Sequence, residues 1–530
     1  SIHMKIIKDF RNYLQEINDT RIISDRVALV FVLIIIFCCA LIRILTFNNL
    51  PLEITLWKEI DYLNISKSFF EHGFNILKPE VPWLADPPRV TSMELPLIPY
   101  LSSLLYALFG YNIFTARFMP MLAYLGIIFF VFKLAQREIG NLTAVLAALA
   151  SAIMPLYHPF GQILFSEPWL IAFSLFTIFQ FAEWLDKEKR SDAIMAVVGF
   201  SLTIALKITA MYILIPIVWI LYRKYKFNIK AYSKYILLGL LALILPVAWY
   251  AYAYYLTYHS VDVFGIYRGH NKFQTLTMLS DTFWYLTMYH RLSGGILGGK
   301  IGLLLCIIGF LAAFLIRKTH LFYTYLIAII AFFIIVAEGQ IDAPYRQLTI
   351  IPVFSVFVAI GAISIIAGIG FIAVKVTNSK FKLNPILVLS VAIILIMIMP
   401  LTNYRFVFSK QEVADKQRYE LAMAIKENKA ENTKIIAAGE YTIHVGGYDM
   451  SPTIYYYADV QGWSLKNTDW NMHVIDSLIN KGATMFTAVD MSREPESLPF
   501  IKQLEEIYPV LYKNEEEELL LLDLTRQTNP

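Results

Sequence analysis

Long apolar runs are the feature that most constrains how this chain can fold. Many of them approach the roughly 20 residues that an α-helix needs to cross the hydrocarbon core of a bilayer. Hydrophobic residues make up 57% of the sequence and charged residues only 16%, whereas soluble proteins carry about 25% charged residues. Because soluble cores could not bury this much apolar surface, the sequence predicts an α-helical polytopic membrane protein. The runs lie at residues 27–47, 112–132, 141–157, 167–184, 192–206, 208–221, 235–256, 301–316, 321–337, 347–374 and 385–402.

The distribution of basic residues tests this count of about eleven spans. If the N-terminus is cytoplasmic, the inside segments hold 20 Lys and Arg in 68 residues, a density about three times that of the outside segments. Such an excess is what the positive-inside rule requires. Residues 95–109 are also apolar but contain Pro96 and Pro99. Counting them as a span would invert the predicted orientation of every later segment and remove the excess of basic residues inside. We therefore interpret them as an interfacial helix.

This topology predicts two domains in a multi-pass protein of the plasma (inner) membrane. Residues 1–402 would form the transmembrane domain, with a large first outer loop at 48–111. Residues 403–530 would form an extracytoplasmic domain, since the chain there alternates short apolar strands such as 434–439 with amphipathic helices such as 500–507. That alternation indicates a small α/β domain.

Two acidic residues stand at the outer ends of predicted spans. Asp61 follows the first span and Glu167 begins the fourth. A carboxylate in such a position could deprotonate a hydroxyl, or two together could hold a divalent ion. The alternative is structural, since carboxylates in loops are more often solvated or cap a helix. We nevertheless take both as candidate catalytic residues, because charged groups near a membrane are costly and usually have a purpose.

Basic and polar residues on the same outer segments supply candidate substrate contacts. Side chains that could pair with an anionic head group such as a phosphate are Lys58, Arg89, Lys207 and Arg346. Candidate substrate-binding residues are Trp57, Glu59, Glu94, His158 and Tyr345. For His158 the alternative is an interfacial side chain, because no residue of metal-ligand type lies at a useful spacing from it.

Several short motifs, taken in order, resemble the GT-C glycosyltransferases that use polyprenyl-phosphate sugars. The resemblance is to the branch that contains protein O-mannosyltransferases and the lipid A aminoarabinose transferase, and it extends over about residues 27–375. The segment WKEIDYLNISKSFF is similar to that branch's W-R-x-x-D-x-x-x-I-A-x-x-F pattern and places Asp61 on its acidic position. The other similar segments are MELPLIPYLSSLLYALFG with YNIFTARFMPML, SAIMPLYHPFGQILFSEPWLIAF, and DAPYRQLTIIPVFSVFVAIGA.

The chain also departs from this branch at identifiable positions. Lys58 stands where many relatives have Arg, which keeps the charge. Glu94 lies where the aminoarabinose transferases have the Lys of a K-P-P-L motif, which argues against that exact activity. Around Glu167 the two-acid D-x-D motif of metal-dependent oligosaccharyltransferases is absent. We therefore expect no required cofactor, with a divalent metal as the less favoured alternative.

The resemblance implies a reaction at the outer membrane face. A polyprenyl-phosphate-linked sugar would be the donor, and the acceptor would be a lipid, a polysaccharide or a protein, with no nucleic acid involved. Asp61 would act as general base on the acceptor, which attacks the anomeric carbon with inversion. Glu167 would position the acceptor or the sugar. The basic side chains would neutralise the polyprenyl phosphate as it leaves.

Two other classes of function compete with this one. The first is a flippase or transporter of lipid-linked saccharides, for which inverted repeats and broken helices in both halves are typical. No such symmetry is visible in the sequence, and the large outer loops favour an enzyme. The second is a non-enzymatic assembly module on the outer face, carried by the C-terminal domain.

Overall fold

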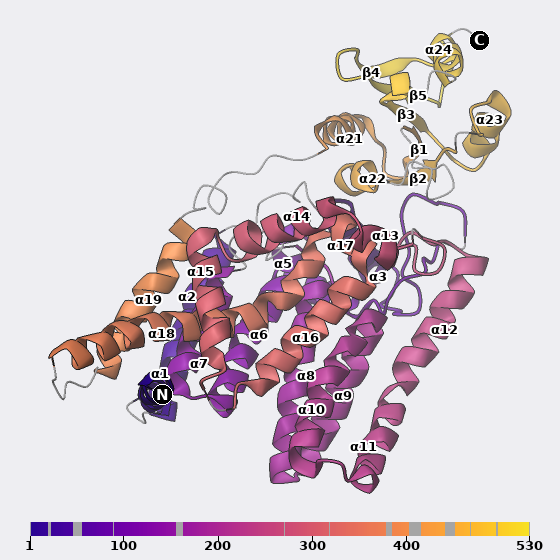
Figure 1. Ribbon diagram of the computed structural model, residues 1–530. Coiled ribbons are helices and arrows are strands. Elements are labelled where there is room, and N and C mark those ends of the chain that lie inside the picture. The colour runs from indigo at the N-terminus through magenta and orange to yellow at the C-terminus, as the bar shows by residue number, and fades with distance from the viewer. Residues whose placement is uncertain are drawn as a thin grey trace.

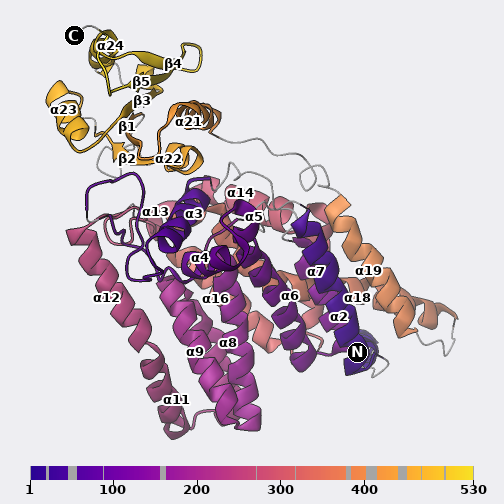
Figure 2. The same ribbon diagram turned by 180° about the vertical axis from the view of Figure 1, so that it is seen from behind.

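The apolar runs form a bundle of long helices, and a smaller α/β domain is stacked on one end of it (Figures 1 and 2). The computed structural model describes residues 2–19, 23–45, 56–87, 89–154, 163–269, 271–316, 318–377, 384–401, 415–439, 451–466, 468–493 and 497–528. The chain is thus an α-helical polytopic protein with a C-terminal α/β region, as predicted. The predicted boundary at residue 402 falls outside the described residues.

Every predicted span coincides with a helix or a pair of consecutive helices. These are α2 (Asp25–Ile44), α6 (Phe118–Glu138), α7 (Asn141–Ile153), α8 (Glu167–Lys187), α9 (Arg190–Leu206), η4 (Ile208–Ile213) with α10 (Leu214–Tyr225), α11 (Ile229–Ala242) with α12 (Ile244–His259), α15 (Lys300–Ala313), α16 (His320–Ile335), α18 (Ile351–Thr377) and α19 (Pro385–Leu401). In the described part of the chain, six helical segments are long and apolar enough to cross a membrane alone, or seven if one bent pair is counted. The count of eleven therefore stays a prediction.

Helix α18 is the centre of the bundle, and glycines let a neighbour approach it closely. Nearly all of its first seventeen residues are buried. A Cβ atom at Gly309 of α15 would lie 1.7 Å from the Phe357 carbonyl oxygen, and one at Gly361 would lie 1.9 Å from that of Leu305. Small residues at such crossings are how membrane helices gain van der Waals contact.

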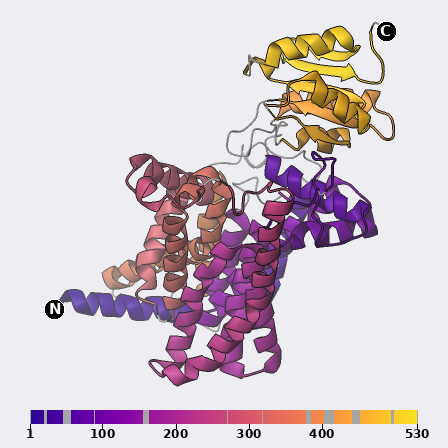
Figure 3. The ribbon, with the colours of Figure 1, turned by 90° about the vertical axis from the view of Figure 1, so that its right-hand side faces the viewer.

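Shorter elements lie between the long helices and the C-terminal domain (Figures 1 and 2). They are α3 (Leu56–Glu71), α4 (Leu97–Phe109), α5 (Ile113–Ala116), α13 (Thr275–Leu279), α14 (Thr282–His290), the π-helical turn η5 (Arg291–Ile296), α17 (Ala337–Asp342) and η6 (Pro344–Ile350). Helix α4 covers the segment that the sequence predicts as an interfacial helix. The first helix, α1 (Ile2–Asp19), lies across the opposite end of the bundle (Figure 3).

The C-terminal domain is a five-stranded sheet with helices on both faces. Its strand order is β2-β1-β3-β5-β4; β1 pairs parallel with β2 and β3, while β5 runs antiparallel to β3 and β4. Alternate residues of β1 face opposite cores: Ile435 belongs to the core with α21 and α22, Ile436 to the core with α23 and α24. The elements are α21 (Lys416–Asn428), β1 (Lys434–Ala438), α22 (Thr453–Ala458), β2 (Gln461–Ser464), α23 (Met472–Asn480), β3 (Met485–Val489), η8 (Met491–Arg493), α24 (Leu498–Ile507), β4 (Val510–Asn514) and β5 (Leu519–Asp523).

Residues 82–85, in the segment predicted to be the first outer loop, pair with the edge of this sheet. The Gly462 amide of edge strand β2 donates to the Pro82 carbonyl (2.9 Å), and the Ala85 amide donates to the Gly462 carbonyl (2.9 Å). An antiparallel bridge joins Leu84 to Trp463. These bonds satisfy backbone groups that an exposed edge strand would leave unpaired. The loop and the C-terminal domain are thus joined through main-chain hydrogen bonds.

Candidate functional site

The ends of three helices that are distant in sequence, α3, α8 and α9, meet at the carboxylate of Glu167. The Lys58 ammonium of α3 lies 2.9 Å from its Oε1 atom, and the Lys207 ammonium lies 2.5 Å from the same atom. Glu167 is the first residue of α8 and is only 1% exposed. Lys207 follows the last residue of α9 in an extended conformation (φ −164°, ψ 117°). The helix is interrupted at this lysine, between α9 and η4. Its ammonium points at the start of α8.

Tyr345 and Arg346 of η6 complete this cluster. The Lys58 ammonium donates to the Tyr345 hydroxyl (3.2 Å) and lies 4.4 Å from the centre of its ring. Arg346 is buried and donates to the Gly339 carbonyl of α17. A Cβ atom at Gly339 would lie 2.1 Å from a guanidinium nitrogen of Arg346, so a glycine is required for this arginine to take its place.

Electrostatics keep Lys58 charged in this environment. Burial by itself lowers the pKa of a lysine. The nearby Glu167 carboxylate acts in the opposite direction and, with Tyr345, holds the pKa of Lys58 well above its ordinary value. An ammonium has three N–H donors. Lys207 uses one of them on Glu167, so this residue keeps donors for a further acceptor.

Asp61 lies one helical turn from Lys58 on α3 and is 6% exposed. Its Oδ1 atom has no hydrogen-bond partner among the described residues. Burial raises the pKa of this carboxyl well above its ordinary value. An unpartnered carboxyl with a raised pKa is what a general base requires in order to accept a proton near neutral pH.

Lys272 is a cation that sequence reasoning missed. It lies between the predicted spans 235–256 and 301–316, where its carbonyl accepts from the Gly339 amide (2.9 Å). Burial lowers its pKa, and the charges of Arg346, Glu94 and Lys58 also act on it. Glu94 is partly buried and is close enough to influence the pKa of Lys58 and that of Lys272. One lysine in a loop of 44 residues carries no periodic signal, so only the fold could single it out.

Other predicted site residues lie elsewhere. Glu59 is fully buried and pairs with Arg117 (3.3 Å). Arg89 contacts Glu80 (3.3 Å) and Gln461 of the C-terminal domain (2.5 Å), and is not part of the Glu167 cluster. Trp57 is 39% exposed at the start of α3. His158 lies outside the described residues.

Metal-binding side chains are not gathered in the described part of the chain. Nowhere in it do three or more His, Cys, Asp or Glu side chains come together in a way that could hold a metal ion. Asp61 and Glu167, proposed above as a pair that could share one, have different surroundings: Glu167 is bound by two lysines, while Asp61 has an unpartnered oxygen.

Comparison with known proteins identifies the fold. Residues 88–252 match the family described as dolichyl-phosphate-mannose-protein mannosyltransferase. No curated protein sequence matches the chain. Among solved structures, the chain is similar to ArnT from Cupriavidus metallidurans in the apo state, with a TM-score of 0.65 and 13% identity over 94% of this chain and 98% of that one.

Two further structures support the same assignment. ArnT from Cupriavidus metallidurans bound to undecaprenyl phosphate has a TM-score of 0.60 and 13% identity, over 93% of this chain and 97% of that one. The apo oligosaccharyltransferase of Archaeoglobus fulgidus has a TM-score of 0.51 and 12% identity, over 93% of this chain and 74% of that one. The chain therefore has the fold of GT-C glycosyltransferases, as its motifs predict.

Proposed function

We propose that this protein is an integral-membrane glycosyltransferase that moves a sugar from a polyprenyl-phosphate donor to an acceptor at the outer membrane face. The observation that carries the proposal is the cluster of cations that begins at Glu167. Lys58 and Lys207 both contact its carboxylate. Arg346 lies 6.0 Å from the centre of the Tyr345 ring beside them, and Lys272 is close enough to Arg346 and Lys58 for their charges to act on its pKa. Such a group of cations fits a phosphate.

The comparisons favour a polyprenyl phosphate as the molecule that carries this phosphate. The matching family is named for a dolichyl-phosphate sugar, and one of the similar structures holds undecaprenyl phosphate. The apolar helices below the cluster would place the prenyl chain in the bilayer. Tyr345, beside Lys58, offers a hydroxyl to the same head group.

Asp61 is the proposed general base. The acceptor oxygen attacks the anomeric carbon while its proton passes to the Asp61 carboxylate. The bond between the anomeric carbon and the phosphate oxygen breaks, and its electron pair leaves with the polyprenyl phosphate. Attack opposite to the leaving group inverts the anomeric configuration. The cations around Glu167 stabilise the phosphate as its charge increases.

The test is transfer of radiolabelled sugar from a polyprenyl-phosphate donor by purified protein, compared with Asp61→Asn. Loss of a general base costs about 10²–10⁴-fold in rate. The variant should keep its Tm or gain stability, because a folded-state pKa raised by burial means that ionisation of Asp61 at neutral pH favours unfolding. Full activity of Asp61→Asn would refute the assignment of the base. Movement of lipid without any transfer by the wild type would favour a flippase.

A further inference from the structure

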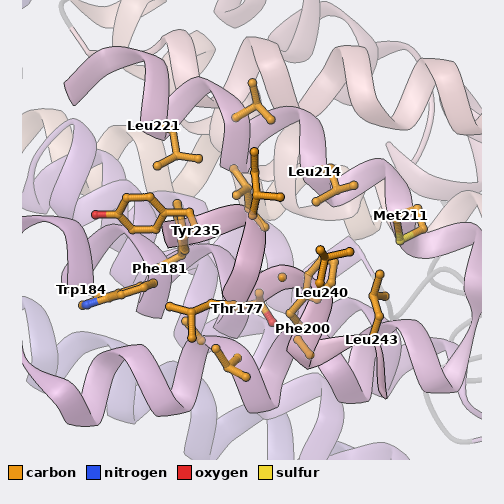
Figure 4. Close-up of a pocket in the computed structure, with 18 residues that line it drawn as sticks. Thr177, Phe181, Trp184, Phe200, Met211, Leu214, Leu221, Tyr235, Leu240 and Leu243 are labelled. Carbon is orange, nitrogen blue, oxygen red and sulfur yellow. The ribbon is translucent and has the colours of Figure 1, made fainter. Parts of the chain in front are cut away.

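An apolar cavity lies within the bundle, in the half away from the C-terminal domain. A cavity of about 240 Å³ opens between α8, α9, α10 and α11. Figure 4 shows Trp184, Tyr235 and Leu221 at one end of it and Met211 and Leu243 at the other. The first end lies near the last turn of α8 and the first turns of α11, where the chain leaves the bundle.

The chemistry of the cavity suits a hydrocarbon chain. Its walls are almost entirely aliphatic and aromatic. The Thr177 hydroxyl already donates to the Phe173 carbonyl (2.7 Å), and the Tyr235 hydroxyl is bonded to that of Tyr225 (2.8 Å). A water needs two to four polar partners, whereas an apolar cavity of about 150 Å³ is known to bind benzene. This cavity is larger and offers a water molecule almost no hydrogen-bond partners.

A lysine lies beside the end of the cavity that contains Trp184, and two more lie close to it along the chain. The Lys234 ammonium lies 5.3 Å from the centre of the Trp184 ring and 5.9 Å from that of Tyr235. Lys230 lies one helical turn earlier on α11, and Lys226 lies in the turn before that helix. All three are exposed.

The acids near this rim have other partners. Glu188 pairs with Lys224 (3.4 Å), while Glu183 and Asp186 pair with Arg137 (2.8 and 2.5 Å). Within the described residues, no carboxylate pairs with Lys226, Lys230 or Lys234. An anionic group from outside the chain would therefore find uncompensated positive charge beside an apolar cavity.

We propose that this cavity and its rim bind an anionic phospholipid, with one acyl chain between α8 and α11 and the phosphate at Lys230 and Lys234. Basic pockets between membrane helices bind anionic lipid head groups in this way. Tryptophan and tyrosine at the mouth suit the depth at which head groups meet acyl chains. The site does not depend on the transferase reaction, because Glu167 stands at the opposite end of α8.

The test measures lipid binding by the full-length protein in detergent. Dioleoyl phosphatidylglycerol should raise the Tm by several degrees and stay bound in native mass spectra, and dioleoyl phosphatidylcholine, which has the same chains, should do neither. Replacing both lysines in Lys230→Ala/Lys234→Ala should weaken phosphatidylglycerol binding by about 25-fold, or roughly fivefold for each lysine.

Gly239 allows a separate test of the acyl-chain site. It lines the cavity, and a Cβ atom there would meet no atom within 4 Å, so Gly239→Phe adds an apolar side chain at the cavity without a clash at its Cβ atom. This variant should lose phosphatidylglycerol binding. The controls are Gly368→Phe, at a glycine of α18 with equally open surroundings, and Lys5→Ala/Lys8→Ala on α1. Both should bind like the wild type.

Three results would overturn the proposal. One is equal stabilisation by phosphatidylcholine, which would remove the role of the lysines. Another is normal binding by Gly239→Phe, which would place the acyl chain elsewhere. The third is displacement of phosphatidylglycerol by undecaprenyl phosphate in the wild type, which would assign the cavity to the tail of the donor.

Discussion

Two buried charge clusters lie at opposite ends of the helical bundle, and they balance their charge differently. The exposed lysines at the rim of the apolar cavity belong to neither cluster. At the end away from the C-terminal domain, Glu138 accepts from Arg223 at 2.5 and 3.2 Å and lies 3.3 Å from Arg137. Arg137 also reaches Glu183 and Asp186. Each of these groups has an opposite partner, and the network ties α6, α8 and α10 together.

At the other end, two cations meet at one carboxylate. Lys58 and Lys207 share Glu167, and Arg346 and Lys272 lie nearby, where Glu94 and Asp262 also act on the pKa of Lys272. A balanced network stabilises the fold and has little left to offer a ligand. An unbalanced one retains the capacity to bind an anion. This difference separates a structural charge cluster from a candidate site.

The largest effect on stability should come from breaking the balanced end. Glu138→Ala removes a buried carboxylate and leaves Arg223 and Arg137 without it, which should cost about 3 kcal/mol. A substantial fall in Tm is expected in detergent, with undecaprenyl phosphate affinity per folded molecule unchanged. A loss of affinity at constant Tm would contradict the division between the two ends.

At the Glu167 end, a substitution should reduce ligand affinity more than it reduces the Tm. Lys207→Gln removes a charged donor near the proposed phosphate, and hydrogen bonds to charged groups contribute about 1.5–3 kcal/mol. The affinity for undecaprenyl phosphate should therefore fall roughly 10–100-fold. The Tm should change little, because Lys58 still pairs with Glu167. Native mass spectrometry with added lipid and a thermal scan measure both, and a large loss of Tm with intact affinity would make Lys207 structural.

The pH dependence of transfer should report on Asp61. A general base is inactive when protonated, so kcat/KM should rise about tenfold per pH unit below the pKa of Asp61 and then level off. Burial raises that pKa, so the midpoint should lie well above the value of about 3.9 for an exposed aspartate. Glu71→Gln, at an exposed acid of the same helix, should leave the profile in place. A midpoint near 3.9 would exclude Asp61 as the titrating group.

The smallest effect is expected from an exposed pair at the balanced end. Lys187 pairs with Glu183 one turn earlier on α8 and is half exposed. Pairs of this kind contribute about 0.3–0.5 kcal/mol. Lys187→Gln should thus shift Tm by a degree or so, and the shift should vanish at high salt. A loss as large as that of Glu138→Ala would show that the network extends to the surface.

The sequence was most informative where a physical pattern repeats. Apolar runs predicted the helices of the bundle, and breaks between runs predicted that Glu167 and Lys207 sit at helix ends. Asp61 and Lys58 could be placed on one short segment for the same reason. The sequence did not predict the edge strands β2 and β4. Strand β2 has only four residues, and β4 (VLYKN) mixes apolar and polar residues, whereas β1, β3 and β5 are mostly apolar.

Side-chain direction was harder to predict than position along the chain. Glu59 is adjacent to Lys58, but consecutive residues on a helix point about 100° apart, and Glu59 turns toward Arg117 instead of the Glu167 cluster. Arg89 lies in a loop with no period, and its partner Gln461 is 372 residues away. Lys272 stayed hidden because the approach of its loop to α17 depends on the complete fold.

The main-chain pairing between residues 82–85 and strand β2 limits how this protein can be recombined. Lys67 of α3 also pairs with Asp459, and Asp86 with Lys481, across the same boundary. A chimera that took only the C-terminal domain from a relative would meet a foreign edge strand and foreign charges. The segment from α3 to residue 87 and the C-terminal domain should therefore be exchanged together, although they are far apart in the sequence.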